Sequence, residues 1–226
     1  MSPDKRYLTS TAITGYSCPE RGQLNLTTCS PFFVVGYQRS GTSLIREEVS
    51  AHPQLCIPPE SSFMSWLLPE FYDWRVDDVF SKRRSQFIDA VFGARKFNLW
   101  SLDANSVHQQ ILQSQPHAYA ELVACVYQAY CGKTGKPQAR WGDKNNVHGF
   151  QLSDILSLFP AARTVWVIRD PRDIWASLTS LSELNSNALE ADIFPSVPET
   201  AGDFARQWVE YNSAVSLALS ANSAPF

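Results

Sequence analysis

The stretch PFFVVGYQRSGTSLIREEVSA, residues 31–51, holds the most informative pattern in this 226-residue sequence. Its first five residues are apolar and rich in β-branched and aromatic side chains, which is typical of a buried strand. Helical spacing begins at Thr42, with Leu44 and Val49 on one side, and ends before Pro53, because a proline disfavours helix in the residue that precedes it. The stretch therefore predicts a strand, a polar loop and a helix in succession.

The loop in this unit resembles a phosphate-binding loop that lacks its lysine. Gly36 and Gly41 have the spacing of the glycines in G-x-x-x-x-G-K-[ST], where loop amides and a helix N-terminus cradle an oxyanion. Thr42 stands where a nucleoside triphosphatase carries lysine, and Arg39 lies inside the loop instead. Such a loop suits a nucleotide that ends in a singly charged sulfonate better than a magnesium–nucleoside triphosphate. The candidate donor contacts are Gln38, Arg39, Ser40, Gly41, Thr42 and Ser43.

A second strand and helix follow near the end of the sequence. Residues 162–168 form an apolar, β-branched run that stops at the polar sequence RDPRD. Asp170 can cap a helix and Pro171 suits its first turn, so we expect a helix from residue 171 to about residue 181. Strands that alternate with helices indicate an α/β fold with a mainly parallel central sheet.

The remaining elements are predicted from shorter patterns. The aromatic-rich region between residues 61 and 115 fits short helices whose rings lie mostly in the core. A helix over residues 119–131 is expected to end at Gly132, in the position of a left-handed cap. A short strand at 55–57, a loop over 184–202 and a last helix over 203–220 complete the prediction.

Bulk composition excludes several classes of protein. A net charge of -3 and a pI near 5.8 argue against a general binder of nucleic acid or anionic membranes. The five cysteines have neither CxxC pairs nor the density of a disulfide scaffold, and the four histidines have no metal-ligand spacing. No continuous apolar run indicates a signal peptide or membrane span. We therefore expect a soluble, cytoplasmic protein with reduced thiols, with an irregular segment over residues 1–30 and one domain over 31–226.

Several further motifs extend the pattern of the first loop. They are AHP at 51–53, IPPE at 57–60, WGDK at 141–144 and VIRDPRD at 167–173. With them the sequence resembles the PAPS-dependent sulfotransferases (PAPS is 3′-phosphoadenosine 5′-phosphosulfate), in the branch that writes the loop as PRSGTT. The likeness covers roughly residues 31–181, with Gln38 and Ser43 as mild departures. It implies a P-loop NTPase-like, three-layer fold, PAPS as donor, PAP as product, and no metal.

The resemblance also implies roles for individual residues. Arg169 and Ser177, eight positions apart, match the pair that binds the 3′-phosphate of the nucleotide. Glu60 matches a general base that takes the proton of the acceptor. Lys144, in a predicted loop, matches a lysine near the bridging oxygen, where Arg39 is also expected to stabilise the charge that develops on the leaving phosphate.

Each of these candidates also has an ordinary structural explanation. Arg39 fits a solvated loop cation, Arg169 a surface ion-pair cluster, and Lys144 an exposed lysine. Glu60 fits a carboxylate that favours a helix N-terminus, and Ser177 is unremarkable on a helix. Only their combination with the loop indicates a site.

The function therefore has open alternatives at this point. The acceptor is a hydroxyl or amine of an unspecified small molecule, glycan or peptide. One alternative is a P-loop kinase or nucleotidase that uses ATP and Mg²⁺, against which the missing loop lysine argues. Another is a non-catalytic, truncated relative, because family members generally continue well beyond residue 226 and the usual C-terminal elements are expected to be absent.

Overall fold

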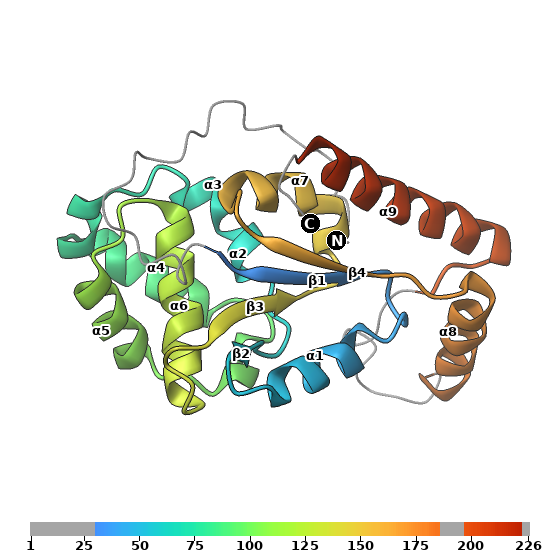
Figure 1. The fold of residues 1–226 in the computed structure, drawn as a ribbon, viewed down its shortest axis with the longest axis horizontal. Helices are drawn as coiled ribbons and strands as arrows, with labels where there is room; N and C mark the ends of the chain where they lie inside the picture. Colours follow the sequence, from blue (N-terminus) through green and yellow to red (C-terminus); the bar gives the residue numbers. More distant parts are fainter. Residues whose placement is uncertain (1–29, 186–196, 223–226) are drawn as a thin grey trace.

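The computed structural model describes residues 30–185 and 197–222, and its framework is a parallel sheet with strand order β2-β3-β1-β4 (Figure 1). β1 lies between two neighbours, so that Val34 pairs with Lys144 on one side and Val165 on the other. Because all pairings are parallel, the carboxyl ends of the strands meet at one edge of the sheet, where ligands of such folds bind. The strands are β1 (Phe32–Gly36), β2 (Leu55–Cys56), β3 (Arg140–Lys144) and β4 (Arg163–Val167).

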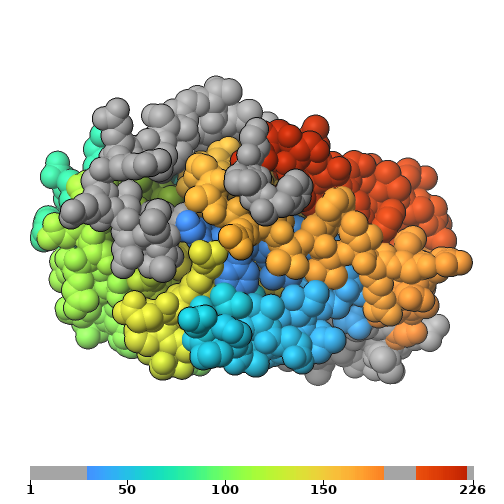
Figure 2. Space-filling view, in the orientation of Figure 1, coloured from blue at the N-terminus to red at the C-terminus, as the bar shows by residue number. Residues whose placement is uncertain are grey.

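Helices cover both faces of the sheet. α1 (Thr42–Ala51) packs on one face, against β1, β2 and β3, while α7 (His148–Leu158) packs on the other face and against α9 (Ala201–Ala221). In the space-filling view α1 and α9 form opposite borders of the visible face, and α8 (Pro171–Asn185) lies at one end (Figure 2). The three-layer α/β fold that the sequence predicted is confirmed.

The aromatic-rich region and the helix that follows it form a cluster of helices beside β3. Phe63, Phe87, Phe97 and Trp100 are almost completely buried, which confirms the prediction that most of these rings belong to the core. The helices are α2 (Phe63–Trp66), α3 (Leu68–Phe71), η1 (Val76–Phe80), α4 (Lys82–Phe92), η2 (Phe97–Trp100), α5 (Ala104–Ser114) and α6 (Tyr119–Lys133), where η marks a 3-10 helix.

Two predictions about local structure are wrong. Lys144 does not lie in a loop but ends β3, with 3% of the residue exposed; the sequence RWGDK hides this strand because its buried positions include charged residues. Helix α6 does not end at Gly132 but continues to Lys133. The residue in the left-handed conformation is Gly135, with φ 76°. The amide of the next residue, Lys136, donates to the Cys131 carbonyl oxygen over 2.8 Å and so caps the end of the helix.

Other predictions fall partly outside the described residues. The irregular segment over 1–30 lies almost wholly there, as do Cys18 and Cys29, whereas Cys56, Cys125 and Cys131 are buried free thiols. The predicted loop over 184–202 is described only at its ends, where α8 reaches Asn185 and α9 begins at Ala201. No helix within 30–185 or 197–222 has the length and apolar character needed to cross a bilayer.

Candidate functional site

The loop after β1 has the backbone of an anion-binding turn. Arg39 and Gly41 adopt left-handed conformations, with φ 67° and 92°. The chain then enters α1, whose first turn holds no acidic residue and whose N-cap, Gly41, offers no side chain. The first amides of a helix have no acceptor within the helix, so those at Thr42 and Ser43 remain available to an anion.

Close packing fixes the start of this loop. A Cβ atom on Gly36 would lie 2.8 Å from both the Thr42 side chain and the Val167 carbonyl oxygen, so only glycine fits. The Gly36 amide donates to the Tyr211 hydroxyl of α9 over 3.0 Å, and the Tyr37 hydroxyl donates to Gln207 of the same helix over 3.1 Å. Two hydrogen bonds to α9 therefore fix the start of the loop.

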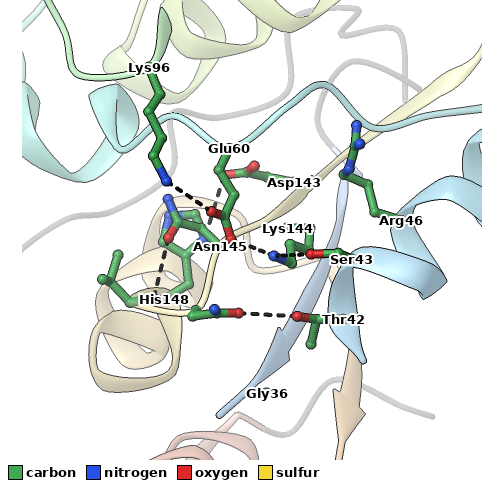
Figure 3. A network of polar contacts seen from close by, with 12 residues as sticks. Gly36, Thr42, Ser43, Arg46, Glu60, Lys96, Asp143, Lys144, Asn145 and His148 are labelled. Atoms are coloured by element: carbon green, nitrogen blue, oxygen red, sulfur yellow. Dashed lines mark hydrogen bonds and ion pairs between the residues drawn. The ribbon is translucent and has the colours of Figure 1, made fainter. Parts of the chain in front are cut away.

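Lys144, Glu60 and Ser43 come together at the carboxyl edge of the sheet (Figure 3). Lys144 Nζ lies 2.5 Å from Glu60 Oε1 and donates to Ser43 Oγ over 3.1 Å. The Lys144 side chain is 4% exposed and that of Glu60 28%, so a largely buried ammonium faces a carboxylate that solvent can reach. Three residues that the sequence selected separately thus form one contact network.

Arg39, Ser177 and Arg169 form a second group on the other side of the loop. Arg39 Nε donates to Ser177 Oγ over 3.0 Å, and Arg169 Nη1 donates to the Arg39 carbonyl oxygen over 3.1 Å. Arg169 also lies 3.9 Å from Asp173, an exposed pair. The loop itself therefore connects the two predicted anion sites, because Ser43 at one end contacts Lys144 and Arg39 within it contacts Ser177 and Arg169.

Sequence comparison identifies the family to which these motifs belong. A family model described as "Sulfotransferase family" matches residues 31–220, most of the chain. The chain belongs to the sulfotransferase family. The resemblance noted from the motifs is thereby confirmed.

Solved structures with a similar fold include two sulfotransferases. One is the sulfotransferase domain from the curacin biosynthetic pathway, 16% identical, with a TM-score of 0.47 over 84% of this chain and 62% of that one. The other is sulfotransferase STF9 from Mycobacterium avium, 16% identical, with a TM-score of 0.44 over 85% of this chain and 56% of that one. The chain thus spans 62% and 56% of the lengths of these structures. No curated protein matches the sequence.

The remaining predicted donor contacts also lie on the loop. Thr42 is buried and donates through Oγ1 to Asn146 Oδ1 over 3.2 Å. Ser40 is 7% exposed, and its hydroxyl makes no hydrogen bond within the described part of the chain. Gln38 is half-buried and Gly41 exposed. A buried hydroxyl left without a partner fits a loop that closes around an anion.

Sequence reasoning missed several residues that support the candidate site. Asn146 bonds Thr42, and Asn145 donates to Ser62 Oγ over 3.1 Å. Lys96 Nζ lies 3.6 Å from Glu60 Oε2, and Tyr211 binds the loop from α9. The two asparagines directly follow Lys144, which is a signal that the sequence offered once Lys144 is known to end a strand. Lys96 and Tyr211 carry no such signal.

Two buried titratable groups lie behind the candidate site, in the core. Asp143 and His148 are both fully buried, with Asp143 Oδ2 3.5 Å from His148 Nδ1. Burial raises the pKa of Asp143 to about 7 and lowers the pKa of His148 to about 3. The imidazole is therefore neutral at physiological pH, and the contact is not an ion pair. Among the described residues, no group of three or more His, Cys, Asp or Glu could hold a metal ion.

Proposed function

We propose that the chain transfers the sulfuryl group of PAPS to a hydroxyl or amine of an acceptor and releases PAP. The observation that carries this proposal is the position of Lys144, whose ammonium contacts Ser43 at the loop over 3.1 Å and Glu60 over 2.5 Å. One cation thus joins the donor loop to a carboxylate that solvent can reach. Such a link supports a transfer in which a bound donor and an entering acceptor meet at one place.

Two sets of residues would hold the nucleotide. The 5′-phosphosulfate end would bind the amides of the loop and of the first turn of α1, with the hydroxyls of Ser40, Thr42 and Ser43. The 3′-phosphate would bind Arg169 and Ser177. Arg39 Nε donates to Ser177 Oγ. We therefore propose that the Arg39 guanidinium also helps to bind the 3′-phosphate, in addition to its expected role at the leaving oxygen.

The transfer step would use Glu60 and Lys144 in complementary roles. The acceptor oxygen or nitrogen attacks sulfur while the bond between sulfur and the bridging oxygen breaks, and the electron pair of that bond stays on PAP. Glu60 takes the proton of the acceptor. Lys144 stabilises the negative charge that develops on the phosphate oxygen. Lys144 would therefore leave Glu60 and contact the donor instead, and Glu60 Oε1 would then be free to accept the proton of the acceptor.

The direct test is release of PAP from PAPS by the purified chain, measured across a panel of phenols, sugars, amines and lipid alcohols. We expect at least one acceptor class to raise PAP release above the rate without acceptor, and Glu60→Gln to abolish that increase. Arg39→Ala and Arg169→Ala should weaken PAP binding. Arg206→Ala is the matched control, because Arg206 lies on the exposed side of α9 and its one ion pair within the described residues is with Asp203.

Calorimetry separates the proposal from other uses of the same loop. PAP is expected to bind and to displace ATP. Preferential binding of ATP with Mg²⁺ would instead indicate phosphoryl transfer. Binding of PAP without turnover for any acceptor would indicate a non-catalytic protein, and either result contradicts the proposed transfer.

A further inference from the structure

The two oxygens of the Glu60 carboxylate contact different lysines. Oε1 faces Lys144, whereas Oε2 lies 3.6 Å from Lys96 Nζ. Figure 3 shows Lys96 reaching Glu60 from a different element than Lys144. The Lys96 side chain is 34% exposed and that of Lys144 only 4%. Lys144 also contacts the donor loop through Ser43, and Lys96 occupies the more solvent-accessible side of the carboxylate.

The segment that carries Lys96 is bound to the segment that carries Glu60. The Trp100 indole donates to the Pro59 carbonyl oxygen over 2.8 Å, and Ser61 Oγ donates to the Arg95 carbonyl oxygen over 3.3 Å. These two hydrogen bonds involve the residues on either side of Glu60 in sequence. An exposed ion pair on flexible side chains contributes little by itself. Here two hydrogen bonds from side chains to backbone carbonyls join the segments that carry the two partners, so the fold brings Lys96 close to Glu60.

The backbone of Lys96 is itself in a sparsely populated conformation. Its φ is 63°, and among the described residues only four other than glycine have positive φ: Arg39, Lys96, Ser101 and Gln115. Two of these four, Arg39 and Lys96, contact predicted site residues. A left-handed conformation in a residue with a long side chain is unfavourable, and such residues cluster at functional sites.

We propose that Lys96 is a positioning residue that holds Oε2 of Glu60, so that Oε1 is presented to the acceptor when Lys144 engages the donor. This inference rests on the proposed function, because it assigns Glu60 the role of base. Without Lys96, the carboxylate would lose its remaining cationic partner once Lys144 moves to the leaving oxygen, and it could rotate away from the acceptor. Displacement of a reacting group by about 1 Å can cost about 100-fold in rate.

The test compares Lys96→Met, which keeps the length of the side chain without its charge, with Lys96→Arg. We expect Lys96→Met to lower kcat for the best acceptor of the panel by about 10- to 100-fold, with KM for PAPS changed less than about twofold and Lys96→Arg restoring most of the rate. Lys82→Met, an exposed lysine on α4, is the control and should match the wild type. Unchanged kcat in Lys96→Met, or an effect confined to KM for the acceptor, would overturn the inference.

A second measurement does not depend on activity. In the full chain with isotope-labelled lysine, an ammonium held by a carboxylate exchanges its protons slowly enough to give an NMR signal. We expect a Lys96 signal, assigned by its loss in Lys96→Arg, that disappears in Glu60→Gln. If the Lys96 signal persists in Glu60→Gln, the inference is wrong even if sulfuryl transfer is established. Absence of PAP release with every acceptor instead removes the proposed function, whatever the spectrum shows.

Discussion

Lys144 is the residue on which the proposed chemistry most depends. Its buried ammonium contacts both Ser43 and Glu60, and a single preorganised donor to a developing oxyanion is worth about 100-fold or more in rate. We therefore predict that Lys144→Met lowers kcat at least about 100-fold. Glu60 keeps Lys96 as a partner, so the variant should still fold. Rates of PAP release at saturating PAPS, with thermal unfolding as a check on folding, provide the measurement.

Ser177 and Arg169 are expected to read the 3′-phosphate. A hydrogen bond to a charged group contributes about 1.5–3 kcal/mol, so Ser177→Ala should weaken PAP binding by roughly tenfold or more while affinity for adenosine 5′-phosphate stays unchanged. Ser180→Ala is the matched control, because Ser180 lies one turn further along α8 and its hydroxyl donates to the Ala176 carbonyl oxygen of the same helix. Equal losses for both nucleotides would show that Ser177 does not recognise the 3′-phosphate.

At the scale of elements, α9 supports the loop through Tyr211. The Gly36 amide is buried, and the Tyr211 hydroxyl is its hydrogen-bond acceptor. Tyr211→Phe leaves that amide unsatisfied at a cost of about 1–3 kcal/mol, so we predict a loss of that size in the free energy of unfolding, together with weaker PAP binding. Urea unfolding measures the first effect, and Tyr72→Phe, on a half-exposed ring, serves as control. A stable Tyr211→Phe variant with normal PAP affinity would contradict this support.

The elements that the sequence predicted best are those with a clear apolar pattern, although β4 itself is only partly buried. β1 and β4 are apolar runs followed by clear helix signals, and α1 spans the predicted residues. β3 escaped prediction because Asp143 and Lys144 are charged residues that the strand buries. A pattern of apolar residues cannot reveal such a strand.

The residues of the candidate site divide in a similar way. Those marked by a local motif were predicted, and those that reach the site from distant parts of the sequence were not. The loop and its helix were predicted from spacing alone, and Glu60 and Lys144 from family resemblance. Lys96 and Tyr211 lie 36 and 175 residues from Glu60 and Gly36, to which they bind. Only the packing of η2 and α9 against the sheet and its loops brings them there, and local sequence patterns do not encode that packing.

At the scale of the whole molecule, the buried pair Asp143 and His148 couples stability to pH in two opposite ways. Asp143 binds its proton more tightly when folded, with a pKa of about 7 against about 3.9 unfolded, so its contribution to stability falls as pH rises from about 4 to about 7. His148 stays neutral when folded, with a pKa of about 3 against about 6.5 unfolded. Its contribution rises with pH from about 3 to about 6.5. Between about pH 4 and 6.5 the two effects oppose each other.

Removal of either group should therefore expose the pH dependence of the other. We predict that the free energy of unfolding of Asp143→Asn rises with pH more steeply than that of the wild type between about pH 4.5 and 6.5, by up to about 1.4 kcal/mol per pH unit. The free energy of unfolding of His148→Gln should instead fall with pH relative to that of the wild type over the same range. Both substitutions remove a titrating group and keep a polar side chain, so the difference in slope from the wild type is informative even if both variants are less stable.

Urea unfolding at several pH values across this range measures the slopes, with Asp89→Asn, at an exposed position on α4, as the control that should run parallel to the wild type. Because Asp143 directly precedes Lys144 in β3 and His148 begins α7, the strand end that carries Lys144 is anchored between these two buried groups. If both variants ran parallel to the wild type, neither group would keep its shifted pKa in the folded chain, and the core behind Lys144 would be open to water rather than sealed around an uncharged pair.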